Sequence, residues 1–234
     1  MSSLFLWLLL AVLLITAVAG LLYWLLVITE GVYLGRRVVV WLYDVTAHKY
    51  DGIKQFDAGA EHFFVTRPFL QSLPLHPAPR ILDVATGTGR VPHYLFAEPT
   101  FNGKVVGVDA SWKMLVLAAE KLAGRHGRFL PIQQLAGRLP FADDTFHGVT
   151  CLESLEFFPS DKAALREMVR VLQPGGTLMV TRRTGWEAKT FIGRFHSPED
   201  FEALLAELGL ADIRTQPWQV DYDLVMAKKV MNDE

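Results

Sequence analysis

A glycine-rich segment between two aspartates is the part of this chain best suited to chemistry. Residues 83–89 read Asp-Val-Ala-Thr-Gly-Thr-Gly, and Asp109 follows 20 residues after Gly89. Glycines at the end of a strand let the backbone turn tightly and approach a ligand. A carboxylate at the end of the next strand can accept hydrogen bonds from both ribose hydroxyls of a nucleoside. The pattern therefore predicts a nucleotide or nucleoside site that includes Asp83, Gly87, Gly89 and Asp109.

Two common nucleotide motifs do not fit this segment. A dinucleotide-binding turn reads G-x-G-x-x-G, and the third glycine position counted from Gly87 and Gly89 is Pro92. A phosphate-binding loop ends in Gly-Lys-Ser or Gly-Lys-Thr, which this sequence lacks. A tight strand-to-helix turn with two surface aspartates is the purely structural alternative.

The elements expected around this segment alternate between strands and helices. Apolar runs predict strands at 81–85, 104–109, 129–133, 148–152 and 177–181, and helices at 91–96, 112–122, 161–172 and 197–209. Residues 213–218 and 224–228 can pair as a last hairpin. This alternation predicts an α/β fold whose mostly parallel sheet is covered by helices on both faces.

Five segments, in this order, resemble the class I S-adenosylmethionine-dependent methyltransferases, and within them the ubiquinone/menaquinone-biosynthesis-like branch. They are residues 48–51, 81–90, 106–115, 139–146 and 172–178, and the likeness runs from about Tyr43 to the C-terminus. The resemblance implies a Rossmann-like sheet of seven strands and S-adenosylmethionine as cofactor. It also implies that the following residues bind that cofactor: Tyr50, Asp83, Ala85, Thr86, Gly87, Gly89, Asp109, Ala110, Met114, Leu135, Ala136 and Leu152.

Two positions depart from the family pattern. Leu135 stands where the family usually has the acid that holds the adenine amino group, so only the backbone at Ala136 is expected to meet the ring. His147 stands where another acid is usual. The first departure favours an alternative, an inactive membrane-tethered scaffold or binding protein. A nucleotide-dependent oxidoreductase is a further alternative, which Pro92 opposes.

The resemblance implies an in-line displacement at a sulfonium methyl group, which depends mainly on positioning and on exclusion of water. A phenol or alcohol acceptor would also need a base. Glu153 and Glu156, just beyond the fourth strand, are the candidate catalytic residues, and a solvated helix or loop face is the alternative for both. Weaker candidates for the base are His147, His93 and Tyr50.

The acceptor is expected to be a lipophilic small molecule, such as a quinone precursor, a lipid or a phenol. A thiol acceptor remains an alternative. Four apolar residues before the last helix are expected to form either a lid or pocket for the acceptor, or ordinary core: Trp186, Phe191, Ile192 and Phe195.

An uncharged apolar segment runs from Leu4 to Ile28. At about 1.5 Å per residue, such a helix exceeds the roughly 30 Å thickness of bilayer hydrocarbon. Residues 17–19 resemble a signal-peptide cleavage site, but no basic residue precedes the run and it continues well past Ala19. We therefore expect a retained single-pass anchor.

Arg36 and Arg37 follow the apolar segment, so the positive-inside tendency predicts a catalytic domain on the cytoplasmic side. The expected organisation is an anchor at 1–30, a juxtamembrane and helical region at 31–79, and the methyltransferase domain at 80–234. Residues 38–43 are apolar and aromatic, which suits either a membrane surface or a helix packed on the domain. The anchor also leaves room for a membrane-protein partner.

Composition narrows the range of partners. The chain has 25 acidic and 23 basic residues, which gives no electrostatic reason to expect nucleic acid. Cys151 is the single cysteine, so an intramolecular disulfide is excluded, and its apolar neighbours suggest an inert core position. The histidines show no metal-ligand spacing, and we expect no metal site.

Overall fold

The structure is a computed structural model and describes residues 2–125 and 127–231. Seven strands form one sheet in the order β3-β2-β1-β4-β5-β7-β6. Strands β1 to β5 run parallel, whereas β7 is antiparallel to both β5 and β6. The predicted mostly parallel seven-stranded fold, with its last hairpin, is confirmed. The strands are β1 (Arg80–Val84), β2 (Lys104–Asp109), β3 (Phe129–Gln133), β4 (Phe146–Cys151), β5 (Leu172–Arg183), β6 (Leu210–Gln219) and β7 (Tyr222–Lys229).

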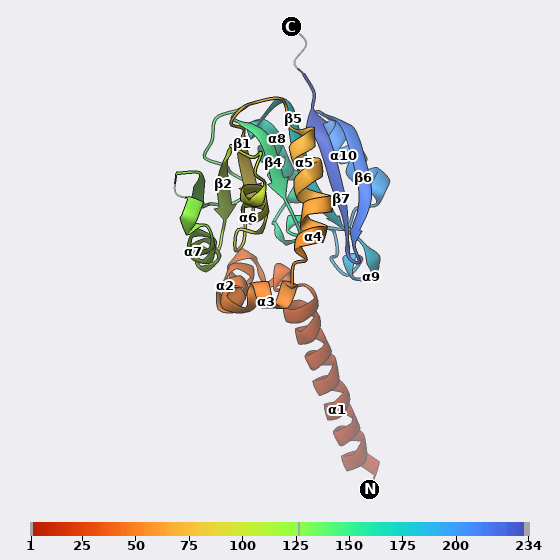
Figure 1. Cartoon of the computed structure of the whole chain (residues 1–234). Coiled ribbons are helices and arrows are strands. Elements are labelled where there is room, and N and C mark those ends of the chain that lie inside the picture. Colours follow the sequence, from red (N-terminus) through yellow and green to blue (C-terminus); the bar gives the residue numbers. More distant parts are fainter. Residues whose placement is uncertain (1, 126, 232–234) are drawn as a thin grey trace.

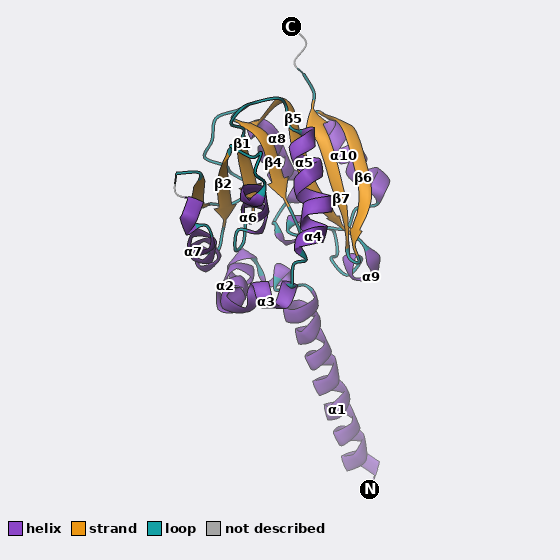
Figure 2. Ribbon diagram, viewed as in Figure 1, coloured by secondary structure: helices purple, strands orange, loops and turns teal. Residues whose placement is uncertain are grey.

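Helices cover both faces of the sheet (Figures 1 and 2). Apolar side chains of α5 and α6 pack on one face, and those of α8 and α10 pack on the other. Every residue of β4 is buried, as a strand with both faces covered requires. The helices of the domain are α5 (Arg67–Ser72), α6 (Arg90–Ala97), α7 (Trp112–Lys121), α8 (Asp161–Val171), α9 (Gly185–Ala188) and α10 (Pro198–Glu207).

The fifth strand is longer than its apolar run predicted. It pairs with β7 as far as Arg183 opposite Tyr222, and its first residue, Leu172, pairs with Phe146. Residues 174–176, between the predicted helix and the predicted strand, are therefore an irregular part of β5, where the register with β4 shifts. Hydrogen bonding to both neighbours, rather than hydropathy, sets the length of this strand.

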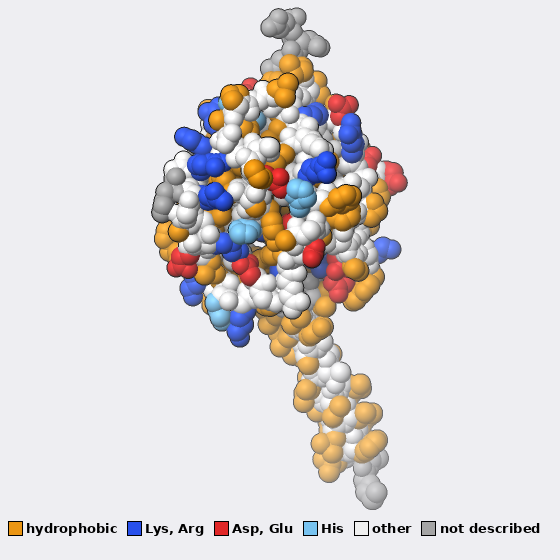
Figure 3. Space-filling view, viewed as in Figure 1, with side chains coloured by type: hydrophobic (Ala, Val, Ile, Leu, Met, Phe, Trp, Pro, Cys, Tyr) orange, Lys and Arg blue, Asp and Glu red, His pale blue; other side chains and the backbone are white. Residues whose placement is uncertain are grey.

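The N-terminal helix α1 (Ser2–Tyr23) continues through one π-helical turn (Trp24–Ile28). Residues 3–28 form a helix long and apolar enough to cross a membrane, with a mean hydropathy of 2.8 and no residue buried. The helix leaves the domain as a rod without charged side chains (Figures 1 and 3). It is exposed along its length, unlike the core helix of a soluble domain.

A tight turn joins α1 to the helix α2 (Arg36–Thr46). Gly31 has φ +78°, and a Cβ at this position would lie 2.9 Å from Cγ1 of Val38, so the close approach requires glycine. A short helix η2 (Val32–Leu34) lies within the turn. Smaller helices follow α2: η3 (Ala47–Lys49), α3 (Tyr50–Lys54), α4 (Ala58–Ala60) and η4 (Glu61–Thr66).

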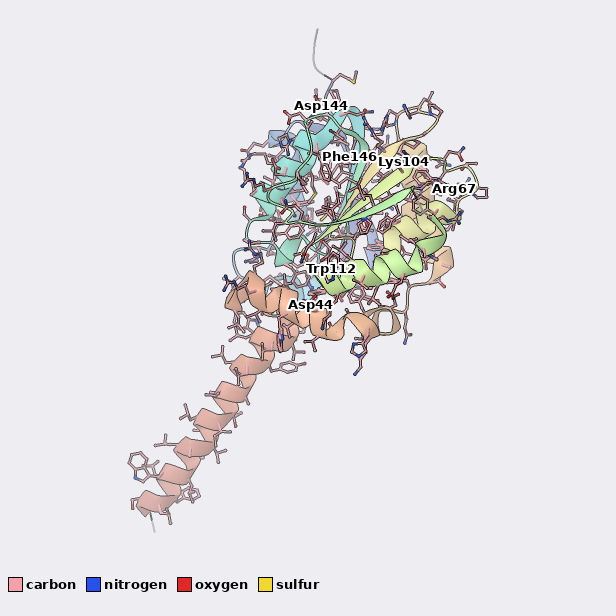
Figure 4. The ribbon with its side chains drawn as sticks, turned by 90° about the vertical axis from the view of Figure 1, so that its left-hand side faces the viewer. Asp44, Arg67, Lys104, Trp112, Asp144 and Phe146 are labelled. Carbon is pink, nitrogen blue, oxygen red and sulfur yellow. The ribbon has the colours of Figure 1, made fainter. Side chains whose placement is uncertain are left out.

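Helix α2 packs on the domain, which was one of the two interpretations of residues 38–43. Val39 is buried, and Asp44 accepts a 2.5 Å hydrogen bond from the Ser111 hydroxyl. Asp44 and Trp112 lie together near the base of α1, whereas Phe146, at the start of β4, lies at the opposite end (Figure 4). The carboxyl ends of the parallel strands thus face the end from which α1 leaves (Figure 1).

Candidate functional site

A cleft of about 340 Å³ lies at the carboxyl ends of β1, β2 and β4 and is closed on one side by α2. Its volume falls within the roughly 300–1,000 Å³ typical of small-molecule sites. The structure brings together ten of the residues selected from the sequence. The selected residues that line the cleft are Tyr50, Ala85, Gly87, Asp109, Ala110, Met114, Leu135, Ala136, Leu152 and Glu153.

The glycine-rich turn presents open backbone to the cleft. Ala85 and Gly87 have φ values of +55° and +54°, and a Cβ on Gly87 would meet no atom within 4 Å. This face of the turn can therefore receive a ligand. Gly89 serves packing instead, because its Cβ would lie 3.2 Å from Ala118 and from Leu122. Neither Gly89 nor Thr86 lines the cleft; Thr86 shapes the turn through its backbone N–H, which donates to Val108 O at 3.0 Å.

Asp109 joins the turn to the end of β2. Its Oδ2 accepts from the backbone N–H of Gly87, and its Oδ1 accepts from that of Ser111, both at 2.8 Å. Burial raises the pKa of Asp109, while the backbone donors oppose that rise. A carboxylate can accept about four hydrogen bonds. The remaining capacity of Asp109 suits a pair of ribose hydroxyls.

Asp83 lies beside the cleft rather than in it. It is buried, and the hydroxyls of Thr86 and Thr150 each donate to its carboxylate at 2.6 Å. Burial raises the pKa of Asp83 to about 6, although these two hydroxyls lower it. Asp83, Thr86 and Arg90 line a hollow of about 30 Å³ under the glycine-rich turn.

The raised pKa of Asp83 should make the free energy of unfolding depend on pH. Its folded-state pKa lies above the ordinary value of 3.8, so the native protein binds more protons between pH 4 and 6. The free energy of unfolding should therefore fall as the pH rises through this range, and the Asp83 contribution should total about 3 kcal/mol. The change would be measured by urea unfolding of the full chain in detergent at several pH values.

Asp83→Asn is the matched control, because its side chain does not titrate. The difference in unfolding free energy between the two chains should change with pH only between about pH 4 and 6. Parallel curves over this range would show that Asp83 is charged throughout, and would overturn the assignment.

Glu153 belongs to a buried cluster of charges that sequence reasoning missed. Arg90 Nη1 donates to Glu153 at 2.5 Å, and Lys54 Nζ donates to it at 2.7 Å. Arg90 Nε also donates to Glu61 at 3.0 Å. Burial alone would raise the pKa of Glu153, but Arg90 and Lys54 hold it below its ordinary value. Glu153 is thus a charged carboxylate at the cleft, and its φ of +52° is unusual for a residue other than glycine.

Glu156 is not brought to the cleft. It is buried and accepts hydrogen bonds from the Tyr222 hydroxyl at 2.5 Å and from Arg183 at 3.2 Å. The interpretation of Glu153 and Glu156 as a solvated face is wrong for both residues. Glu156 links β5 to β7, and its geometry gives a catalytic role no support.

An aromatic wall completes the cleft on the side of α2. The ring of Tyr43 lies 6.2 Å from that of Tyr50 and 6.0 Å from that of Phe157, measured between centroids. The Tyr43 hydroxyl donates to Glu30 at 2.8 Å. Sequence reasoning found Tyr50 alone, because Tyr43 and Phe157 belong to no motif and lie far apart along the chain.

The four residues expected to form a lid or core fall into two groups. Phe191 is buried in a small core with Val32 and Val39, whereas Trp186 and Ile192 are about 70% exposed. Phe195 is also exposed. None of the four lines the cleft, so the acceptor-pocket interpretation is wrong for them.

The two histidines named as weaker bases also lie elsewhere. His147 Nδ1 accepts from the backbone N–H of Arg80 at 3.0 Å, at the amino edge of the sheet. His93 is exposed on α6 and does not line the cleft. Cys151 is fully buried, and burial raises its pKa, as suits a core thiol. Across residues 2–125 and 127–231, no three His, Cys, Asp or Glu side chains gather as metal ligands.

Leu135 occupies the cleft wall where an acid was expected. Its neighbour Gln134 also lines the cleft, and the Gln134 side-chain oxygen accepts from the Leu135 N–H at 2.8 Å. Leu135 therefore offers an apolar surface, and the backbone of Ala136 and the amide of Gln134 supply polar groups. Sequence reasoning missed Gln134, because it stands one position before the family's usual acid.

Comparison with known proteins agrees with this geometry. Residues 81–176 match the family described as a methyltransferase domain. A demethylmenaquinone methyltransferase from Symbiobacterium thermophilum is 36% identical over 137 residues, and a ubiquinone/menaquinone biosynthesis C-methyltransferase UbiE from Geotalea daltonii is 30% identical over 141 residues. The matches cover 58% and 59% of this chain, and the chain spans 55% and 60% of the length of these relatives.

Solved structures share the fold at low identity. An S-adenosylmethionine-dependent methyltransferase from Aquifex aeolicus superimposes with a TM-score of 0.61 at 19% identity, over 80% of this chain and 98% of that one. The [4+2]-cyclase SpnF superimposes with a TM-score of 0.67 at 18% identity, over 83% of this chain and 96% of that one. These likenesses show the fold alone.

The residues of the cleft fit the cofactor of this family. Gly87 leaves room at the turn, Asp109 retains acceptor capacity for two hydroxyls, and Leu135 and Ala136 supply an apolar slot for a purine ring. Residues 81–176 therefore match a methyltransferase domain, the chain resembles the class I S-adenosylmethionine-dependent methyltransferases of the ubiquinone/menaquinone-biosynthesis-like kind, and S-adenosylmethionine is its cofactor.

Proposed function

We propose that this chain is a membrane-anchored enzyme that methylates a lipophilic small molecule, with an isoprenoid quinone precursor as the first candidate. The observation that carries the proposal is the position of the cleft. It opens at the end of the sheet from which α1 leaves, and α2, the helix that follows α1, forms one of its walls. The demethylmenaquinone and ubiquinone/menaquinone methyltransferases among the relatives support the choice of acceptor.

The membrane part of the proposal rests on α1. We assign residues 1–30 to a single-pass anchor, 31–79 to a juxtamembrane and helical region, and 80–234 to the methyltransferase domain. The uncharged span over residues 3–28 supports the anchor. Arg36 and Arg37 support a cytoplasmic position of the domain.

Each part of the cleft has a task in this proposal. Bound S-adenosylmethionine supplies a methyl group on a positively charged sulfur. Asp109 holds the ribose hydroxyls. The turn at Gly87 lets the ligand approach the protein backbone closely. Arg90 and Asp83, in the adjoining hollow, offer a positive and a negative group to the carboxylate and the ammonium of the amino-acid end.

The acceptor side of the cleft is aromatic. Tyr43, Tyr50 and Phe157 can stack on a flat ring and keep water from the reacting atoms. For a displacement with a good leaving group, positioning of the reactants and exclusion of water contribute most to the rate. Glu153 adds a fixed negative charge to the cleft at the end of β4. This charge can attract the positively charged methyl donor and accept a hydrogen bond from a phenol hydroxyl. We propose Glu153, and not Glu156, as the catalytic carboxylate.

Methyl transfer in a membrane tests the proposal. The full chain, in proteoliposomes, would receive S-adenosylmethionine with a radioactive methyl group and one acceptor at a time. We expect label in the organic extract with a demethylated isoprenoid quinol. Glu153→Gln should transfer at least about tenfold more slowly because the charge is lost. Its binding of S-adenosylhomocysteine should change much less.

The other outcomes separate the alternatives. If label appears on a small thiol and on no quinol, the acceptor is a thiol and the quinol proposal is wrong. Cofactor binding without transfer to any acceptor would favour an inactive scaffold with the methyltransferase fold. Leu135 is the observation that favours this second candidate, because a leucine at this position cannot hydrogen-bond to the adenine amino group.

A further inference from the structure

We propose that the carboxyl end of the domain lies on the surface of a lipid bilayer, through exposed apolar side chains that surround the base of α1. This inference rests on the anchor in the proposed function and extends it from one helix to a whole face of the domain. The side chains come from three separate parts of the chain. We call them the docking face: Trp41 (58% exposed), Val45 (47%), Trp186 (70%), Ile192 (69%) and Val220 (93%).

Helix α2 contributes to the docking face because its different sides have different surroundings. Val39, Val40 and Tyr43 line the cleft. Val38 and Leu42 lie against Gly31 of the turn after α1. The remaining side carries Arg37, Trp41 and Val45, which are spaced four residues apart and exposed. A helix on a soluble surface would normally carry polar residues on this side.

Two other segments reach the same end through the sheet. Residues 185–196 follow the carboxyl end of β5, and the tip of the β6–β7 hairpin lies beside it, because Arg183 pairs with Tyr222. The backbone N–H of Thr184 donates to Asp221 O at 2.7 Å. Trp186, Ile192 and Val220 are thus at the edge that also holds the cleft.

A hydrogen bond connects this edge to the base of the anchor. The Tyr33 hydroxyl donates to the backbone oxygen of Ile192 at 3.1 Å, and the Tyr33 ring stacks on Trp24 at 4.9 Å. Trp24 belongs to the last turn of the apolar helix. The exposed segment around Ile192 is therefore fixed next to the point where the chain would leave a membrane.

A bilayer is the occupant that the surroundings indicate. Helix α2 follows a helix of membrane-spanning length in the chain, and the Tyr33 hydroxyl binds the segment at Ile192, so an inserted α1 would bring the docking face close to the lipid surface. Tryptophan at this level is typical of membrane interfaces. Exposed cations lie around the face at Arg36, Arg37, Lys49 and Lys189, and they suit anionic headgroups.

Docking on the bilayer would supply the acceptor directly. Helix α2 has the cleft on one side and the docking face on another, so only the thickness of one helix separates lipid from the site. A lipophilic acceptor can then pass from the bilayer to the aromatic wall without crossing bulk water.

Spin labels on single cysteines test the inference in the full chain. Cys151 is buried, so the unaltered chain serves as the background for labelling. Labels would be attached to Ile192→Cys and Val220→Cys, in vesicles of phosphatidylcholine with phosphatidylglycerol. Leu75→Cys is the matched control, because Leu75 is fully exposed and precedes β1 at the opposite edge of the sheet. Leu13→Cys reports insertion of α1.

Collision of each label with oxygen, which concentrates in lipid, is compared with collision with a water-soluble nickel complex. We expect the oxygen-to-nickel ratio at Ile192 and Val220 to exceed that at Leu75 severalfold, and the ratio at Leu13 to be highest. Ratios at Ile192 and Val220 equal to that at Leu75, with a lipid-like ratio at Leu13, would overturn the docking face and leave the anchor intact. A water-like ratio at Leu13 would overturn the anchor and the docking face together, whatever the outcome of methyl-transfer assays.

Discussion

Asp109→Ala should weaken binding of S-adenosylhomocysteine by at least about a hundredfold, because two hydrogen bonds from ribose to a charged acceptor contribute about 3 kcal/mol together. The same substitution releases the Gly87 N–H, which now donates to Asp109 at 2.8 Å and holds the glycine-rich turn in place. Equilibrium dialysis of the full chain in detergent would measure the dissociation constant.

Asp143→Ala is the control for this experiment. The Asp143 side chain is 71% exposed and pairs with Arg170 away from the cleft, so its removal should leave binding unchanged. A thermal unfolding curve for each variant separates a lost contact from a lost fold. Binding by Asp109→Ala within about threefold of the parent chain would contradict the assignment of the ribose site.

Arg90→Met should produce the largest loss of stability of the substitutions considered. Arg90 lies between Glu61 and Glu153, and all three side chains are at least nine-tenths buried. Removing the cation leaves two carboxylates buried without their shared partner, which costs about 3–5 kcal/mol in comparable sites. Urea unfolding at pH 7 would measure the change in the free energy of unfolding.

Two further variants make this prediction specific. Lys162→Met breaks an exposed pair with Glu207 and should change the free energy of unfolding little, because solvent screens exposed ion pairs. Adding Glu61→Gln to Arg90→Met removes one of the stranded charges and should recover part of the loss. A cost for Arg90→Met no larger than that for Lys162→Met would contradict the buried cluster.

Local patterns in the sequence predicted most of the sheet. The runs at 104–109 and 129–133 coincide with β2 and β3, because each is a short apolar segment between polar or glycine-rich turns. The length of β5 could not be predicted in this way. It depends on pairing with β7, which begins about 40 residues further along the chain.

Motifs also predicted the part of the site that lies within single segments. Ala85, Gly87 and Asp109 reach the cleft because they follow neighbouring parallel strands. The charged cluster could not be found from spacing, since Arg90 and Glu153 are 63 residues apart. The positions of Trp186 and Ile192 could not be predicted for a different reason, because apolar character alone does not distinguish a buried residue from an exposed one.

The most direct test of the central claim is calorimetric titration of the full chain, in detergent, with S-adenosylhomocysteine. We predict one site per chain and a dissociation constant in the micromolar range, or about −8 kcal/mol of binding free energy. Heat of binding that is absent up to millimolar ligand, from a chain that still unfolds cooperatively, would contradict the assignment of the cleft as a cofactor site.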